Sequence, residues 1–117
     1  MTKDELSSIK DRVIIGMKEF KKYSDGAYSS WDIRKVKKIL SKYYKEMNLC
    51  YNKKTGDYKD IVKSTVLALN ELNEKCEYSL IETDQREDIC EYIIQTAYTF
   101  NFIESDSEDI TEEWREW

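Results

Sequence analysis

The chain has 117 residues, of which 40% are hydrophobic and 37% charged, and its net charge at pH 7 is −5. This length suits a single domain with one modest core, and the aliphatic and aromatic content excludes an intrinsically disordered chain. There is no apolar run of 18 residues, and the first ten residues lack the apolar region of a signal peptide. We therefore expect one cytoplasmic domain over residues 1–117, without a membrane partner.

The composition favours long helices, because the chain has no proline and only three glycines. Thr2 and Glu5 have the spacing of a capping box. Behind them, apolar residues recur at steps of three and four up to about Lys22, which predicts a first helix. Asp25 and Gly26 then give the signal of a turn.

A second helix is expected to begin after Ser29 or Ser30, with an apolar side that continues to Met47. Its other side carries six basic residues: Arg34, Lys35, Lys37, Lys38, Lys42 and Lys45. A loop that closes at Gly56 follows, and helical periodicity returns over residues 58–75. The sequence therefore predicts a third helix there.

The last part of the chain predicts one long helix and one short one. Asp84 and Glu87 form a second possible capping box, which would open a fourth helix that runs to about Phe102. Thr111 or Asp109 could cap a short C-terminal helix within an acidic tail, residues 104–117. The predicted fold is all-α, an irregular bundle of four main helices plus a short C-terminal helix.

The residue inventory argues against an enzyme. The chain has no histidine, which excludes Ser-His and Cys-His nucleophile pairs and the usual zinc ligand sets. It also lacks the glycine-rich loops that cradle phosphates. Cys50, Cys76 and Cys90 fall in or beside apolar stripes, so we expect reduced structural thiols. No catalytic residue, metal site or cofactor is predicted.

Charge is distributed unevenly along the chain. Residues 1–60 carry fifteen Lys/Arg and nine Asp/Glu, whereas residues 61–117 carry four Lys/Arg and fifteen Asp/Glu. Such an acidic half gains when a cationic protein binds to it. The candidate partner-binding residues are those on the exposed side of the fourth helix and in the tail: Asp84, Glu87, Glu91, Tyr98, Glu104, Asp106, Glu108, Asp109, Glu112, Glu113, Trp114, Glu116 and Trp117.

The two tryptophans of the tail have two interpretations. Aromatic side chains in an acidic surround are frequent anchors of protein interfaces. Large aromatics near a chain end also tie that end to the core, which is the favoured interpretation for Trp114. For Trp117, packing and partner contact are equally well supported.

The uneven charge also fits two arrangements that need no protein partner. The lysines of the second helix could lie beside the acids of the fourth, so that the asymmetry is partly neutralised within the fold. The basic run at residues 34–38 could touch phosphate, but it is short and the whole chain is acidic. We therefore expect no nucleic-acid partner.

The segments NELNEKCEYSLIETDQREDICEYI and DITEEWREW resemble small acidic helical bacterial proteins of uncharacterised families. Residues 64–117 also look like immunity proteins that are paired with bacterial polymorphic or contact-dependent toxins. This resemblance implies a non-enzymatic protein, a monomer or weak homodimer, that neutralises a cationic toxin such as a nuclease. The alternative is a structural or regulatory adaptor that self-associates and recruits a protein partner.

Overall fold

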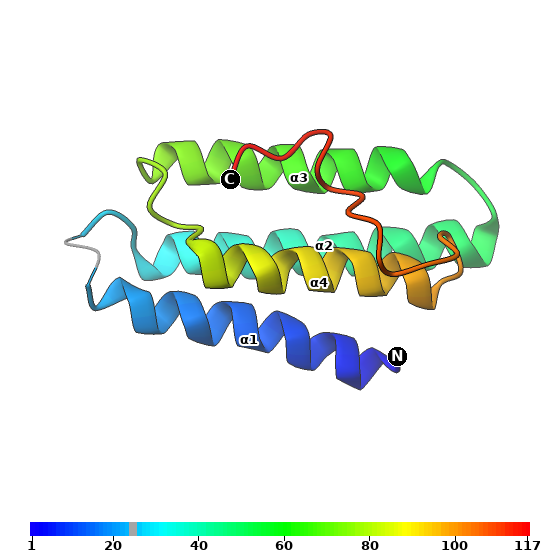
Figure 1. The fold of residues 1–117 in the computed structure, drawn as a ribbon, viewed down its shortest axis with the longest axis horizontal. Helices are drawn as coiled ribbons and strands as arrows, with labels where there is room; N and C mark the ends of the chain where they lie inside the picture. Colours follow the sequence, from blue (N-terminus) through cyan, green and yellow to red (C-terminus); the bar gives the residue numbers. More distant parts are fainter. Residues whose placement is uncertain (24–25) are drawn as a thin grey trace.

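The computed structural model describes residues 1–23 and 26–117, and this part of the chain is all-helical. It contains α1 (Lys3–Lys21), α2 (Ser30–Lys53), α3 (Tyr58–Lys75) and α4 (Thr83–Thr99), with no strand among the described residues (Figure 1). None of these helices is long and apolar enough to cross a membrane. The predicted all-α class is thus confirmed.

The first two helices begin where their capping residues predict. The Thr2 hydroxyl accepts the Glu5 N–H (3.1 Å), and the Glu5 carboxylate accepts the Thr2 N–H (3.0 Å). Ser29, rather than Ser30, is the N-cap of α2, and it forms a capping box with Asp32. In the predicted turn that follows α1, Asp25 lies outside the described residues.

The start of α4 differs from the prediction. Its N-cap is Glu82, whose side chain makes no capping hydrogen bond, so the predicted capping box of Asp84 and Glu87 is wrong. Both residues lie inside the helix. Asp84 lies in the first turn, where the helix dipole favours its negative charge. It can therefore stabilise the start of α4 without acting as the N-cap.

The end of α4 is also earlier than Phe102. Asn101 takes a left-handed backbone conformation (φ +62°), and the Phe102 N–H then donates to the Ala97 carbonyl (3.0 Å). This is the hydrogen-bonding pattern that closes a helix at its C-terminus. The helix therefore stops at Thr99.

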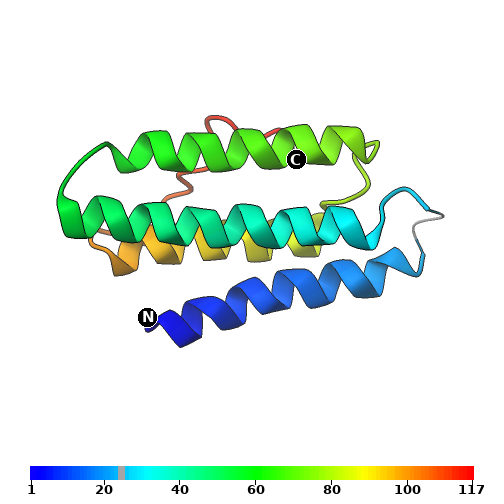
Figure 2. The same ribbon diagram turned by 180° about the vertical axis from the view of Figure 1, so that it is seen from behind.

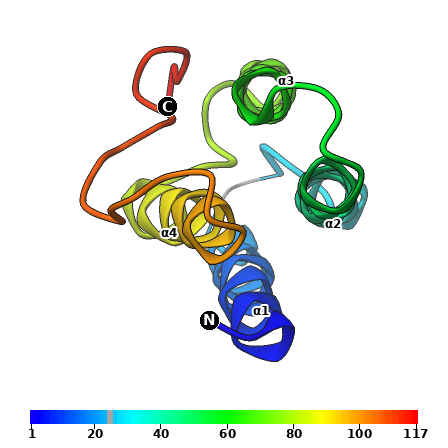
Figure 3. The same ribbon diagram turned by 90° about the vertical axis from the view of Figure 1, so that its right-hand side faces the viewer.

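The helices pack as two pairs, α1 with α4 and α2 with α3, and α2 also contacts α1 and α4 (Figure 3). Tyr43 and Tyr92 are the largest fully buried side chains, and their rings meet edge to face at 6.2 Å. The Tyr43 hydroxyl donates to the Ile93 carbonyl (2.7 Å) and the Tyr92 hydroxyl to the Leu40 carbonyl (3.4 Å). Burial raises the pKa of both tyrosines, which therefore stay neutral and join α2 to α4.

Gly16, in the interior of α1, permits a close approach to α4. A Cβ atom at this position would lie 3.0 Å from Nε2 of Gln85, a side chain that is 2% exposed. A larger residue would therefore force the Gln85 side-chain amide to shift. The packing of α1 on α4 explains why a residue of low helix propensity occurs there.

The predicted C-terminal helix is absent from the described residues. After α4 the chain turns back along that helix and crosses to α3 without forming a helix of its own (Figure 1). Residues 110–114 form turns, in which the Thr111 carbonyl accepts both the Trp114 N–H (3.2 Å) and the Arg115 N–H (3.0 Å). So short a segment gains too few helical hydrogen bonds to offset the cost of nucleation.

Candidate partner-binding surface

The structure places the four predicted residues of α4 on one side of that helix. An α-helix turns by about 100° per residue, so Asp84, Glu87, Glu91 and Tyr98 lie opposite the buried stripe centred on Ile93. Asp84 and Glu87 are exposed, and 40% of the Tyr98 surface is accessible. These residues therefore share one solvent-facing side of α4.

Arg12 of α1 neutralises part of this side. Its guanidinium lies 2.6 Å from a Glu91 carboxylate oxygen and 3.2 Å from a carboxylate oxygen of Asp88. Burial raises the pKa of Asp88, and Arg12 opposes that rise. Neither Arg12 nor Asp88 was predicted as a site residue, because their pairing depends on how α1 packs against α4.

The C-terminal segment, residues 100–117, contains six exposed acids and one acid, Asp109, that is bonded within the segment. Asp106 forms no ion pair with a described residue, but it accepts a hydrogen bond from Gln95 (2.9 Å), on the exposed side of α4. This contact places the segment beside that side of the helix. Six acids are exposed and, among the described residues, have no ion-pair partner: Glu104, Asp106, Glu108, Glu112, Glu113 and Glu116.

We call these six acids, together with Asp84, Glu87, Glu91 and Tyr98, the acidic surface. The elements that carry these residues, α4 and the C-terminal segment, lie toward the viewer in Figure 1. In the described part of the chain, Glu91 is the one carboxylate of this surface that forms an ion pair, and its partner is Arg12. The surface therefore keeps a net negative charge.

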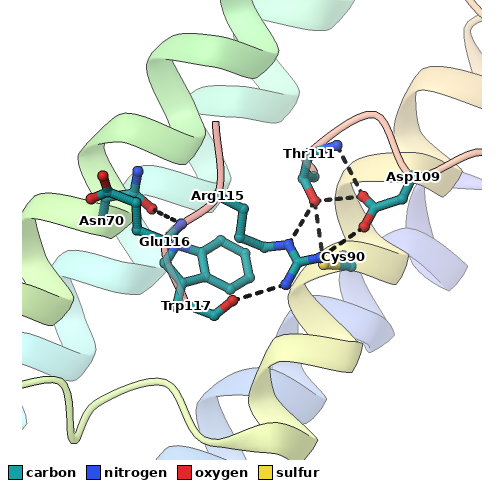
Figure 4. Close-up of polar contacts among 7 residues, drawn as sticks. All are labelled: Asn70, Cys90, Asp109, Thr111, Arg115, Glu116 and Trp117. Carbon is teal, nitrogen blue, oxygen red and sulfur yellow. Dashed lines mark hydrogen bonds and ion pairs between the residues drawn. The ribbon is translucent and has the colours of Figure 1, made fainter. Parts of the chain in front are cut away.

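Asp109 differs from the other acids because it is engaged within the segment (Figure 4). Its carboxylate accepts hydrogen bonds from the Thr111 N–H (2.9 Å), the Thr111 hydroxyl and the Arg115 guanidinium (3.0 Å). Burial opposes ionisation of Asp109, but these hydrogen bonds outweigh it and lower the pKa of the carboxyl. The structure thus gives Asp109 an internal role.

Arg115 connects the turn at Asp109 to the last residue. Its Nε donates to the Thr111 hydroxyl (3.2 Å), Nη1 donates to the main-chain oxygen of Trp117 (2.8 Å), and the guanidinium lies 5.5 Å from the Trp117 ring centroid. Thr111 itself is fully buried, with its hydroxyl 3.5 Å from the Cys90 sulfur of α4. These contacts hold the segment against α4.

Asn70 attaches the same segment to α3. Its side-chain amide donates to the Trp114 carbonyl (2.8 Å) and accepts the Glu116 N–H (3.1 Å), and the residue is 8% exposed. Asn70 was not predicted as a functional residue. The available signal was an asparagine at a buried helical position, because a buried amide requires polar partners from elsewhere in the chain. We call Asn70, Asp109, Thr111 and Arg115 the polar clamp.

Both tryptophans of the segment are half-buried and pack against the hydrophobic core. The favoured interpretation of Trp114 is confirmed, and Trp117 packs in the same way. The packing leaves only part of each indole at the surface. A partner could therefore contact only the exposed part of each indole, together with the acids around it.

A cleft of about 580 Å³ opens between α3 and the C-terminal segment. Three carboxylates and one lysine line it, so it favours a cationic group, and its size is ample for one lysine or arginine side chain. The lining residues are Tyr58, Lys59, Val62, Glu108, Asp109, Ile110, Glu113 and Trp114. The sequence did not predict this cleft, because its two walls are some 50 residues apart.

Internal neutralisation does not explain the acidic surface. No ion pair in the described part of the chain joins α2 to α4. The basic residues of α2 have one such contact, between Lys42 and Glu46 of the same helix. In Figure 2, which shows the molecule from behind, α2 lies in front of α4.

The arrangement of the acidic and cysteine side chains bears on metal binding and on thiol reactivity. No group of three or more Cys, Asp or Glu side chains in the described residues is arranged to hold a metal ion. The three cysteines are free thiols, as predicted. Burial raises the pKa of Cys76 to about 11 and also raises that of Cys90, so neither forms a reactive thiolate near neutral pH.

Comparison with known proteins gives one family and no individual relative. No curated protein and no solved structure matches the chain. The family match spans residues 17–117, which include α2, α3, α4 and the whole polar clamp but only the last part of α1. The chain therefore belongs to the family of unknown function DUF5713.

Proposed function

We propose that this protein is a non-enzymatic binding protein that holds a basic protein partner on its acidic surface. The observation that carries the proposal is the set of exposed carboxylates of α4 and the C-terminal segment that have no ion-pair partner among the described residues. Like charges held together repel one another, and a cationic partner relieves that repulsion. The same field steers a basic partner toward the surface and raises the association rate.

The resemblance of residues 64–117 to immunity proteins supports a specific partner. On that basis we propose that the partner is a cognate cationic bacterial toxin, such as a nuclease, which the protein neutralises in the cytoplasm by direct binding. The acid-lined cleft beside Glu108 and Glu113 offers a place for a lysine or arginine of the toxin. Glu87 and Tyr98 would extend the contact along α4.

The test uses the full chain as bait in its native lysate, at 50 and 200 mM salt, followed by association kinetics with the captured protein. We expect Glu87→Lys with Glu113→Lys to slow association at least tenfold and to flatten its salt dependence. The matched control is Asp60→Lys with Glu71→Lys, two exposed acids of α3 that produce the same change in net charge.

Two results would count against the proposal. One is that the bait captures no basic protein in stoichiometric amount at either salt concentration. The other is that both charge-reversal variants slow association equally, because the effect would then follow net charge and not the acidic surface. Co-expression with the captured protein would show directly whether its toxicity is neutralised.

A second candidate is an adaptor that self-associates. It is favoured by the location of α2, with six basic residues, on the side of the molecule opposite α4 and the acidic surface (Figures 1 and 2). Head-to-tail contact would bring these two sides together. Light scattering at micromolar concentration separates the two candidates: the adaptor requires a stable oligomer at low salt, whereas the toxin-binding protein requires none.

A further inference from the structure

We propose that the protein also binds single-stranded nucleic acid, in a basic groove that follows α2 and reaches α1 at both of its ends. This groove is not part of the acidic surface. The proposal goes beyond the function proposed above and does not depend on it. It also departs from the sequence-based expectation that no nucleic acid binds, for reasons that the packing of α1 supplies.

The groove consists of three adjoining depressions. Residues of α2 alone line the first, which shares Arg34 and Lys37 with the second and Ser41 and Lys45 with the third. Residues of α1 also line the second and third, and the Lys10 ammonium of α1 donates to the Ser41 hydroxyl of α2 (3.2 Å). The two helices are in contact and lie side by side in Figure 2.

The charged side chains that line the groove are all positive among the described residues. Nine lysine and arginine side chains of residues 1–23 and 26–117 line the three depressions, and no carboxylate of those residues does. Of these nine, Lys42 alone has an ion-pair partner among the described residues, Glu46 at 3.6 Å. The other eight charges are thus available to an anionic ligand.

The sequence alone underestimates this groove for two reasons. The basic run visible in the chain belongs to α2 alone, whereas α1 adds Lys3, Lys10 and Lys18 once the helices pack. The net charge of the whole chain also hides the local charge.

Trp31 makes nucleic acid a better ligand than a featureless polyanion. It is 69% exposed at the start of α2, beside the groove, and the Arg34 guanidinium lies 4.9 Å from its ring centroid. Exposed aromatic rings next to cations are the platforms on which unpaired bases stack. From Trp31 to Lys45 the helix extends for about 21 Å, enough for a few nucleotides.

The experiment measures fluorescence anisotropy of labelled oligo(dT) and oligo(U), 20 nucleotides long, with the full chain at 50, 100 and 200 mM NaCl. We expect Lys37→Glu with Lys45→Glu to weaken binding at least tenfold. The slope of log affinity against log salt should fall by roughly 1.4, which corresponds to two lost phosphate contacts on a single strand. Lys53→Glu with Lys63→Glu, two exposed lysines outside the groove, should change affinity less than twofold.

Trp31 provides a separate readout of base stacking. Trp31→Ala should weaken binding at least fivefold without changing the salt slope, and Trp31→Phe should recover most of that loss. All of these substitutions are at exposed positions, so circular dichroism should show unchanged helix content. Reversal of Glu87 and Glu113 should leave oligonucleotide affinity intact, which separates this proposal from the acidic-surface proposal.

Four outcomes would overturn the proposal. No anisotropy change at 50 mM NaCl would exclude the ligand, and equal losses in both lysine variants would exclude the groove. Tighter binding to polyglutamate or to anionic phosphatidylglycerol vesicles than to oligonucleotide would assign the groove to another class of ligand. A rise in molecular mass at low salt that Lys37→Glu with Lys45→Glu abolishes would assign it to a second copy of this chain.

Discussion

Helix α1 and the C-terminal segment both pack on α4 but are held in different ways. As a helix, α1 satisfies its own backbone hydrogen bonds and presents a stripe of apolar side chains to the core. The C-terminal segment has no helix of its own, so side chains of the polar clamp must satisfy its backbone groups. Single polar substitutions should therefore damage the segment more than they damage α1.

The largest effect is expected from Asn70→Leu. This change removes two hydrogen bonds and leaves the Trp114 carbonyl and the Glu116 N–H without their partner. We expect a loss of about 2–3 kcal/mol in the free energy of unfolding, and faster proteolysis within residues 104–117. Urea denaturation and limited proteolysis measure the two effects.

The control for Asn70 is Asn52→Leu. Asn52 is an exposed asparagine of α2, whose amide donates to the Asn48 side chain four residues before it (3.1 Å). Its replacement should change stability by less than about 0.5 kcal/mol. Equal losses in the two variants would mean that the polar clamp adds nothing beyond an ordinary surface contact.

An intermediate effect is expected from Asp109→Asn, with a defined pH dependence. The pKa of Asp109 is lowered in the folded protein, so its contribution to stability is present above the ordinary value of 3.8 and is lost as the pH falls through the lower, folded value. At neutral pH the substitution should cost about 1–2 kcal/mol. The difference from the wild type, measured by urea denaturation, should shrink on acidification below about pH 4.

Asp106→Asn is the matched control for this dependence, because Asp106 is an exposed acid of the same segment. It should show a smaller cost at neutral pH than Asp109→Asn. A cost for Asp109→Asn that grows as the pH falls would have the wrong sign and would refute the role assigned to its hydrogen bonds with Thr111 and Arg115.

The smallest effect is expected from Arg12→Ala, although Arg12 contacts two carboxylates. The arginine side chain is 53% exposed, so water and salt screen both ion pairs. We expect a loss of about 0–1 kcal/mol, reduced further at high salt, by thermal denaturation at two ionic strengths. If Arg12→Ala lost more unfolding free energy than Asn70→Leu, polar contacts would matter more for α1 than for the C-terminal segment, contrary to our expectation.

The sequence predicted well those features that depend on neighbouring residues. The capping box at Thr2, the cap at Ser29 and the bounds of α3 are all set within a few positions along the chain, and the structure bears them out. Apolar periodicity likewise predicted the apolar side of the second helix up to Met47, which is buried. Local propensity and the packed fold agree in these helices.

The features that the sequence missed depend on distant residues. The segment after α4 has helix-capping residues, but its backbone partner Asn70 is more than 40 positions away, so turns form in place of the predicted helix. The pairing of Arg12 with Glu91 spans 79 positions. The acids of the candidate site could be recognised individually, whereas the acid-lined cleft and the basic groove exist only after packing.

The contact between Thr111 and Cys90 has a practical consequence. Cys90 is half-buried beneath the C-terminal segment, and its hydrogen bond to Thr111 is lost whenever the segment moves away from α4. Cys50 and Cys76 are buried in the bundle and should remain protected during such an opening. The rate at which a thiol reagent modifies Cys90 therefore reports how often the segment opens, in the native protein and without an added label.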